Sequence, residues 1–291
     1  MPTQPQEGKI KIIECPRDAM QGILDFIPTR DKIQYINELI KVGFDSLDCG
    51  SFVSPKAIPQ MRDTSEVLDQ LDLEKNGTKL SVIVANERGA ADAVLHEKIS
   101  YLGFPFSISE TFQRRNTNSS INDSLETVKH LLDLCDKNSK SLTIYISMGF
   151  GNPYNDEWSV TIVNDWIGKL AALGVKEFSL SDTVGVSTPE TIACVFSNAL
   201  QAFPELEFGG HFHTTPWEWK EKVEAAYQNG CMRFDGAIKG YGGCPMAKDD
   251  LLGNMPTELL IEFFGYEKLG LKKAPFEGAF NLAETIFNHY S

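Results

Sequence analysis

Apolar and polar side chains along the chain follow two periods. Short apolar-rich runs, several of them with apolar and polar residues in alternation, are typical of β-strands. Longer stretches between them repeat apolar residues at spacings of three and four, which is typical of amphipathic helices. Eight runs of the first kind are present, at residues 9–15, 44–50, 79–85, 99–107, 141–148, 176–182, 207–213 and 233–239.

The predicted helices carry recognisable end signals. The helical stretch 29–43 ends at Gly43, a residue suited to the left-handed position that follows a helix. Thr188–Pro189 and Thr215–Pro216 match the N-cap and first helical positions, so each pair predicts a helix start. The same apolar spacing predicts further helices over 120–139, 159–174, 187–200 and 215–230.

Eight strands that alternate with helices predict parallel pairing and right-handed crossovers. A closed (β/α)8 TIM barrel satisfies this α/β pattern economically. An open, doubly wound sheet is the alternative, and the absence of a GxGxxG motif after the first strand disfavours it. We expect a single TIM-barrel domain over residues 1–291, with the barrel at about 9–250 and a short C-terminal helical extension at about 251–291.

The composition narrows the classes of partner. A formal net charge of −13 repels nucleic-acid phosphates and anionic membranes, so neither is expected as a partner. No apolar stretch approaches the roughly 18 residues needed to span a bilayer. The first nine residues lack the apolar segment of a signal peptide. The six cysteines form no CxxC pair, so we expect free thiols in a cytoplasmic protein.

Residues capable of catalysis or metal binding follow several of the predicted strands. The active site of a TIM barrel lies at the carboxyl ends of its strands, so this distribution fits the predicted fold. The residues are Arg17, Asp18, Asp48, Glu110, Asp182, His211, His213 and the GYGGCP loop at 240–245.

His211 and His213 are two of only five histidines and lie at the end of one predicted strand. Residues two apart on a strand point to the same side, so both imidazoles face either the barrel interior or the helices. Facing inward, they supply half of a site for Zn, Mn, Fe or Co, and Asp18 is the best third ligand. Two hydrogen-bonded histidines without a metal are the alternative.

Three further residues suit carbon–carbon bond chemistry beside such a metal. Arg17 can stabilise an enolate oxygen, although an arginine–aspartate pair is often only a surface turn. Cys244 suits a proton donor on a loop that closes over the mouth, although a cysteine in a glycine-rich turn can be incidental. Asn254 can give an amide oxygen to the metal or simply precede a helix.

Six segments in chain order resemble the 3-hydroxy-3-methylglutaryl-CoA (HMG-CoA) lyases. They are ECPRDAMQ, GSFVSPKAIPQM, LSDTVGVSTP, HFH, GYGGCP and GNMPTE, and the resemblance covers roughly residues 9–265. HMG-CoA lyases belong to a superfamily of metal-dependent aldolases and synthases that are TIM barrels. The SFVSPK and GGCP segments are specific to the lyases, whereas the superfamily shares the RD and HxH segments.

The resemblance implies a retro-Claisen cleavage of HMG-CoA, or of a related 3-hydroxyacyl thioester, to acetyl-CoA and acetoacetate. It implies a divalent metal, Mg or Mn in the first place and Zn or Co as alternatives. Arg17 would stabilise the enolate, and Cys244 would protonate its carbon. The implied metal ligands are Asp18, His211, His213 and Asn254. The implied catalytic residues are Arg17, Cys244, Asp182, Asp48 and His211, and the implied substrate-binding residues are Gln21, Arg17, Gly242 and Gly243.

The chain departs from the lyase pattern at several positions. Asp48 stands where the family has Glu, and Thr214 stands where it has Asp. Lys239 replaces a small residue, and Trp217 and Trp219 replace a segment of smaller residues. Three alternatives stay open: a lyase for a different 3-hydroxyacyl thioester or free acid, a Claisen-type synthase or aldolase of the superfamily, and a metal-retaining barrel that binds without turnover. We expect an acyl-CoA substrate and a homodimer.

Overall fold

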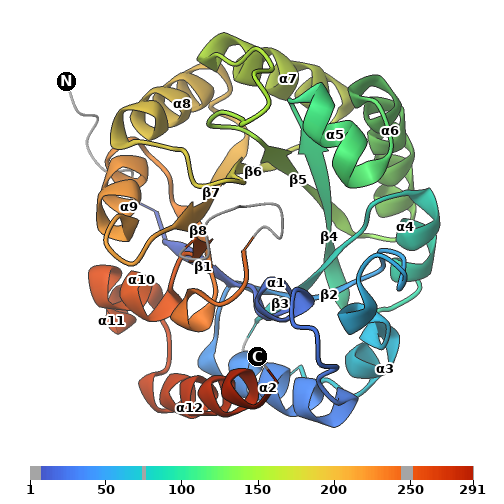
Figure 1. Ribbon diagram of the computed structural model, residues 1–291, viewed down its shortest axis with the longest axis vertical. Helices are drawn as coiled ribbons and strands as arrows, with labels where there is room; N and C mark the ends of the chain where they lie inside the picture. Colours follow the sequence, from blue (N-terminus) through green and yellow to red (C-terminus); the bar gives the residue numbers. More distant parts are fainter. Residues whose placement is uncertain (1–7, 74–76, 244–251, 291) are drawn as a thin grey trace.

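Eight parallel strands close into a ring in the computed structural model, which describes residues 8–73, 77–243 and 252–290 (Figure 1). Neighbouring strands pair in chain order, and the pairing of β8 with β1 closes the ring. The fold is therefore the (β/α)8 TIM barrel that the sequence predicts. The strands are β1 (Lys11–Glu14), β2 (Ser46–Ser51), β3 (Lys79–Ile83), β4 (Ile99–Ser107), β5 (Ser141–Ser147), β6 (Glu177–Asp182), β7 (Glu207–Thr214) and β8 (Arg233–Gly236).

Helices surround the barrel as an outer layer (Figure 1). All eight predicted strands are present, with ends shifted by at most three residues. The helices are α1 (Pro16–Gln21), α2 (Thr29–Val42), α3 (Thr64–Asp69), α4 (Glu87–Ala93), α5 (Glu110–Thr117), α6 (Ile121–Lys137), α7 (Val160–Leu173), α8 (Pro189–Ala202), α9 (Trp219–Gln228), α10 (Thr257–Phe264), α11 (Tyr266–Leu269) and α12 (Lys273–Tyr290).

Two of the three predicted helix-end signals act as expected. Gly43 follows α2 with a φ of +92°, and Thr188 caps α8. The helix start predicted at Thr215–Pro216 is wrong, because α9 begins only at Trp219. The Thr215 hydroxyl instead donates to the side chain of Glu218 at 2.8 Å, within a turn that precedes the helix.

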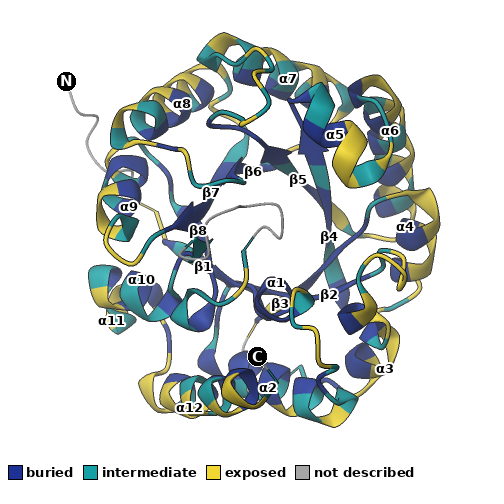
Figure 2. Ribbon diagram, viewed as in Figure 1, coloured by how far each residue is buried: buried dark blue, intermediate teal, exposed yellow. Residues whose placement is uncertain are grey.

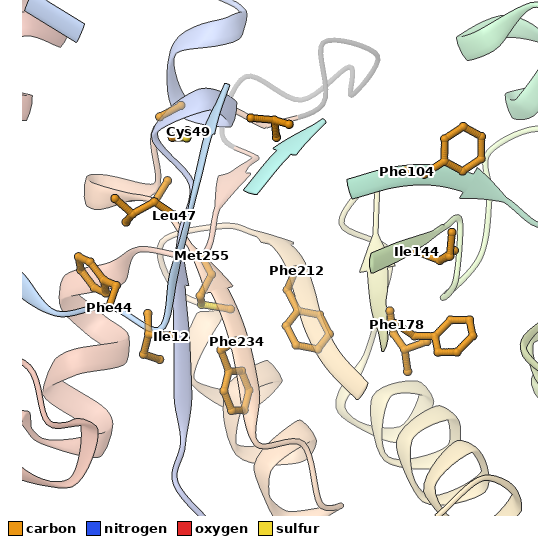
Figure 3. Close-up of a cluster of buried hydrophobic side chains, with 14 of the residues drawn as sticks. Ile12, Phe44, Leu47, Cys49, Phe104, Ile144, Phe178, Phe212, Phe234 and Met255 are labelled. Carbon is orange, nitrogen blue, oxygen red and sulfur yellow. The ribbon is translucent and has the colours of Figure 1, made fainter. Parts of the chain in front are cut away.

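The hydrophobic core lies between the strands and the helix layer. Figure 2 shows the strands and the inner faces of the helices as buried. Figure 3 shows outward strand side chains such as Leu47, Phe178 and Phe234 within this core. Inside the ring, by contrast, buried positions carry polar side chains such as Ser179 and Asp235. The barrel interior is therefore available for polar chemistry.

After β8 the chain returns to the mouth before it joins the helix layer. The short strand β9 (Gly253–Asn254) pairs with β7 and places Asn254 opposite His213. Farther along, α12 packs on α2, where the rings of Tyr35 and Phe287 lie 6.1 Å apart. The predicted C-terminal helical extension thus covers part of the barrel. Among the described helices, none combines the length and apolar character needed to cross a membrane.

Candidate active site

A cavity of about 410 Å³ opens at the carboxyl ends of the strands. Its lining contains both polar and apolar side chains. The polar lining residues are Arg17, Asp18, Gln21, Asn116, Thr117, Tyr145, Ser147, Ser181, Thr183, His211 and His213. The apolar lining residues are Val53, Ala57, Ile58, Ile83, Ala85, Pro105 and Phe112. The cavity can therefore contact both polar and apolar parts of a ligand.

His211 and His213 project into this cavity from β7, and their ring centroids lie 5.3 Å apart. Asp18 approaches them from α1, directly after β1, rather than from the strand itself. One potential ligand atom from each of the three residues lies within 4.8 Å of the others. The imidazoles thus face inward, and the three side chains form a possible metal site.

Hydrogen bonds determine which ring nitrogen of each histidine is free. The Nδ1 of His213 lies 2.8 Å from the carbonyl oxygen of Thr183, so it must donate its proton there. The Nδ1 of His211 lies 3.2 Å from a carboxylate oxygen of Asp235. With Nδ1 as the donor, Nε2 of each neutral imidazole is the nitrogen that can bind a metal, and Nε2 of His213 is buried without a hydrogen-bond partner among the described residues. Leaving a buried polar atom unpaired costs about 1–3 kcal/mol, and a bound cation would remove that cost.

Asp235 on β8 is a site residue that the sequence analysis missed. Its buried Oδ2 accepts hydrogen bonds from His211 and from the hydroxyl of Ser179, at 3.0 Å. A carboxylate on the second nitrogen of a ligating imidazole fixes the ring and raises its basicity. The signal was present, because Asp235 alternates with Phe234 and Gly236 in the RFDG strand and so takes the inward face.

Arg17 is the centre of a buried charge cluster beside the histidines. Its Nε lies 3.2 and 3.1 Å from the two oxygens of Asp48, and its Nη2 also contacts Asp48. Its Nη1 donates to Asp18 at 2.6 Å and to Gln21 at 2.9 Å. The guanidinium is thus held rigidly on the cavity wall. Asp48 lies behind it, outside the cavity lining.

Burial and neighbouring charge set the protonation of these groups. Burial raises the pKa of Asp18, but the charge of Arg17, and to a smaller extent the charge of the histidines in their protonated forms, outweighs it, so the pKa lies below its ordinary value. For Asp48, burial outweighs Arg17 and leaves the pKa above its ordinary value. Burial lowers the pKa of His213, and the nearby His211 lowers it further. An ionised Asp18 and a neutral His213 are the forms that bind a metal.

Asn254 and Gly242, which lies in an earlier turn, pack against Asp18. The Nδ2 of Asn254 donates to Asp18 at 2.7 Å and to the carbonyl oxygen of Tyr241 at 2.9 Å. Its amide nitrogen, rather than its oxygen, therefore faces Asp18, and its role as a fourth ligand stays a prediction. Gly242 has a φ of +82°, and a Cβ there would collide with the main chain of Asp18. Gly243 lines the cavity.

Other predicted residues are not brought to the cavity. Asp182 ends β6, but Lys222 and the loop after β6 engage its carboxylate, and it does not line the cavity. The expectation for Glu110 is wrong, because it begins α5 and pairs with Arg114 at 2.7 Å on the helix surface. Asp182 follows Phe178 and Leu180 on the outward face of β6, and Glu110 lies in the helix after β4, so neither side chain faces the cavity. Cys244 lies outside the described residues.

Apart from Asp48, which contacts Arg17, the departures from the lyase pattern lie away from the cavity lining. Lys239 pairs with Glu284 of α12 at 2.5 Å. Trp217 is 73% exposed, and Trp219 packs against the core. The buried hydroxyl of Thr214 donates to the next carbonyl oxygen at 3.0 Å. None of these four side chains therefore forms part of the described cavity wall.

Most of the polar lining that β5 and β6 supply was not predicted from the sequence. Tyr145 presents its ring edge to His211, with centroids 5.8 Å apart. Ser147 lies two residues further along the same strand, and Ser181 occupies β6. The two-residue period of β5 was the available signal, because inward side chains must alternate with apolar outward ones.

Three known proteins are similar to the chain. Residues 9–272 match the HMGL-like family model. The hydroxymethylglutaryl-CoA lyase YngG of Bacillus subtilis is 35% identical over 258 residues, which cover 88% of this chain and 85% of that protein. The 3-hydroxy-3-isohexenylglutaryl-CoA/hydroxymethylglutaryl-CoA lyase of Pseudomonas aeruginosa is 32% identical and covers 86% and 83%. An HMG-CoA lyase structure from A. baumannii, in complex with coenzyme A and 3-methylmalate, has a TM-score of 0.85 at 30% identity and covers 98% of this chain and 92% of that chain.

Proposed function

Because the chain belongs to the HMGL-like family and is a lyase, we propose that it is a divalent-metal-dependent enzyme that cleaves HMG-CoA to acetyl-CoA and acetoacetate. A related 3-hydroxyacyl thioester is the alternative substrate. One observation carries the proposal. Two free imidazole nitrogens and a carboxylate converge in the cavity, and a fixed guanidinium lies beside them.

The residues of the site fit a divalent cation. Asp18, His211 and His213 would hold it, with Asn254 as the predicted fourth ligand. The unpartnered Nε2 of His213 is the atom whose burial a cation explains. Imidazole ligands suit Mn²⁺, Co²⁺ and Zn²⁺, whereas Mg²⁺ favours oxygen ligands. Mn²⁺ is therefore the first metal to test, and Mg²⁺ is the second.

The proposed reaction breaks the bond between C2 and C3 of the acyl group. A base beside the metal site would take the proton of the tertiary hydroxyl, the oxygen of which becomes the ketone of acetoacetate, and the bonding electron pair passes to the enolate of acetyl-CoA. A bound divalent cation supplies Lewis acidity toward the oxygens of the substrate. His211 has a single free nitrogen, which cannot bind a cation and accept a proton at once, so we assign it to the ligand set.

Arg17 is placed to stabilise the enolate. Asp48 orients its guanidinium before substrate arrives, so little reorganisation is needed when the thioester oxygen gains charge. Gln21 and Gly243 lie on the same wall and would contact the acyl group. Cys244 keeps its predicted role as the proton donor to the enolate carbon.

The apolar lining residues of the cavity suit the uncharged part of an acyl-CoA. The A. baumannii relative is bound to coenzyme A, which supports this class of ligand. The two arginines of α5 are not assigned to the coenzyme phosphates. Arg114 pairs with Glu110, and the guanidinium of Arg115 lies 4.8 Å from the ring centre of Tyr154.

Incubation of the Mn²⁺-loaded protein with HMG-CoA tests the proposal. We expect equal amounts of acetyl-CoA and acetoacetate, and loss of both products after chelation of the metal. A panel of thioesters with longer 3-substituents, including 3-hydroxy-3-isohexenylglutaryl-CoA, decides the substrate, since the P. aeruginosa relative is named for that compound. Cleavage of only a longer thioester would redirect the assignment.

Two further outcomes separate the alternative functions. Condensation of acetyl-CoA with a 2-oxo acid, without cleavage of any thioester, would favour a synthase. Metal binding without turnover of any compound would favour a binding protein. Three predictions stay untested: the homodimer, the single domain over residues 1–291 and the cytoplasmic location. Light scattering of the purified protein tests the homodimer.

A further inference from the structure

The ammonium of Lys222 is buried behind the site and does not line the cavity. Lys222 lies on α9, and only 2% of it is exposed. Its Nζ donates to Oδ2 of Asp182 at 2.9 Å, to the carbonyl oxygen of His213 at 3.0 Å and to that of Gly185 at 3.4 Å. One side chain of the helix layer is therefore bonded to the ends of both β6 and β7.

The carboxylate of Asp182 connects this ammonium to the loop after β6. It accepts hydrogen bonds from the main-chain nitrogens of Val186 and Ser187, at 2.8 and 3.1 Å, and from the Ser187 hydroxyl at 2.5 Å. Thr183 lies within the loop that these bonds close, and its carbonyl oxygen accepts from Nδ1 of His213. The orientation of the His213 ring thus depends on a loop that Asp182 holds.

We propose that Lys222 is a positioning residue for the metal site and acts on His213 at two points. The ammonium holds the main chain of His213 directly. It holds the ring through Asp182 and the carbonyl of Thr183. Metal ligands must stay within about 0.5 Å of their productive places, and a buried ion pair whose other bonds are satisfied can fix such a geometry. The inference rests on the proposed function, because it concerns the proposed metal site.

The chain offers a matched control in a second buried lysine. Lys32 on α2 is also 2% exposed, pairs with Asp63 at 2.7 Å and donates to the carbonyl oxygen of Gln60. Neither Lys32 nor Asp63 lines the cavity. Lys32→Met and Lys222→Met each leave a buried carboxylate without its cation, so both lower stability. Only Lys222→Met is expected to alter the metal site.

The Mn²⁺ dissociation constant, measured by electron paramagnetic resonance, tests the proposal. We expect Lys222→Met to weaken Mn²⁺ binding about 10- to 100-fold and to change the visible spectrum of the Co²⁺ form. Lys32→Met should change neither. If Lys222→Met does not fold, Lys222→Met/Asp182→Asn removes both buried charges, and we expect its Mn²⁺ binding to be weakened at least about 10-fold. Wild-type affinity in a folded Lys222 variant would overturn the proposal.

The metal-free protein gives a second, independent readout. Nitrogen-15 NMR of the His213 imidazole reports which ring nitrogen carries the proton. We expect one Nδ1-protonated tautomer in the wild type and in Lys32→Met, and a mixture in the Lys222 variants. A wild type that binds no Mn²⁺ contradicts the proposed function. Unchanged His213 signals in the Lys222 variants instead contradict the positioning role.

Discussion

Two clusters of charged side chains lie at opposite ends of the barrel and are built differently. The floor cluster stands at the amino ends of four strands and comprises Lys11, Glu177, Glu207 and Arg233. Lys11 lies 2.7 Å from Glu207, and Arg233 lies 2.5 Å from Glu177. Two cations therefore face two carboxylates, so the charges of these four residues cancel without any ligand.

The mouth cluster has an excess of acceptors. One cation, Arg17, faces the carboxylates of Asp18 and Asp48. The two imidazoles beside them engage other groups through Nδ1, so in their neutral forms Nε2 of each is an acceptor. A cluster whose charges cancel can stabilise the fold by itself, whereas acceptors directed into a cavity can bind a cationic ligand. The comparison predicts that variants at the mouth change chemistry and that variants at the floor change stability.

The largest effect is expected for Asp18→Asn, because Asp18 is the only anion among the three converging residues. We expect kcat/KM to fall at least about 1000-fold and Mn²⁺ binding to be lost. Activity assays and metal titration measure the two effects. Glu207→Gln makes the same chemical change at the floor and should keep both properties. Wild-type Mn²⁺ binding in Asp18→Asn would show that the mouth cluster does not differ from the floor cluster in binding a cation.

Arg17→Met comes next in size. We expect kcat to fall about 100- to 1000-fold, because the variant lacks the donor that faces the developing enolate. The metal content, measured by atomic emission, should stay at its wild-type value. The change leaves Asp48 buried without its cation, so Arg17→Met/Asp48→Asn serves as the variant that folds more readily. Equal loss of metal and activity would instead assign Arg17 a role in holding the ligands.

The side to which a residue points could be predicted from the sequence where the residue lies within a regular strand. Strand alternation fixes the side on which His211 and His213 lie, and it predicted the eight strands. Asp182 continues the outward set of Phe178 and Leu180 on β6, so strand alternation already directs its carboxylate to the helix layer. Glu110 lies beyond the end of β4, where the strand period carries no information. The inward direction of Asp235 could be predicted from strand alternation, but its contact with His211 could not, because His211 lies on a different strand.

Lys222 shows a second limit of the sequence. It lies beside Val223 and one turn before Ala226 on the buried face of α9, so its position was unusual for a lysine. The acceptors of its ammonium come from the ends of β6 and β7. Only the assembled barrel brings these three elements together. Tertiary partners of this kind cannot be inferred from one sequence pattern.

An intermediate effect is expected for Asp235→Asn. The amide keeps the shape of the carboxylate but no longer increases the basicity of His211, so we expect Mn²⁺ affinity and kcat/KM each to fall about 10- to 100-fold. Isothermal titration and steady-state assays measure them. Ser179→Ala removes the other hydrogen bond of this carboxylate and should have a smaller effect. If Ser179→Ala has the larger effect, His211 does not depend on the charge of Asp235.

The smallest effect on activity is expected for Lys11→Met at the floor. Burial raises the pKa of Glu207, but the hydrogen bond from Lys11 and the charge of Arg233 outweigh it, so the pKa lies below its ordinary value. Such a carboxylate stabilises the fold above the pKa of the unfolded chain and loses this contribution as the pH falls through the folded-state pKa. Lys11→Met should therefore lower the melting temperature more at pH 7 than at pH 3.

The floor pair is partly exposed, which limits the size of this effect. The side chains of Lys11 and Glu207 are 34% and 39% exposed, so solvent screening keeps the contribution below about 1 kcal/mol. Thermal unfolding followed by circular dichroism at both pH values measures it, and kcat at pH 7 should stay within about twofold of the wild type. A larger loss of kcat with intact Mn²⁺ binding would show that the floor also shapes the site, because Glu207 of the floor and the two histidines lie on the same strand, β7.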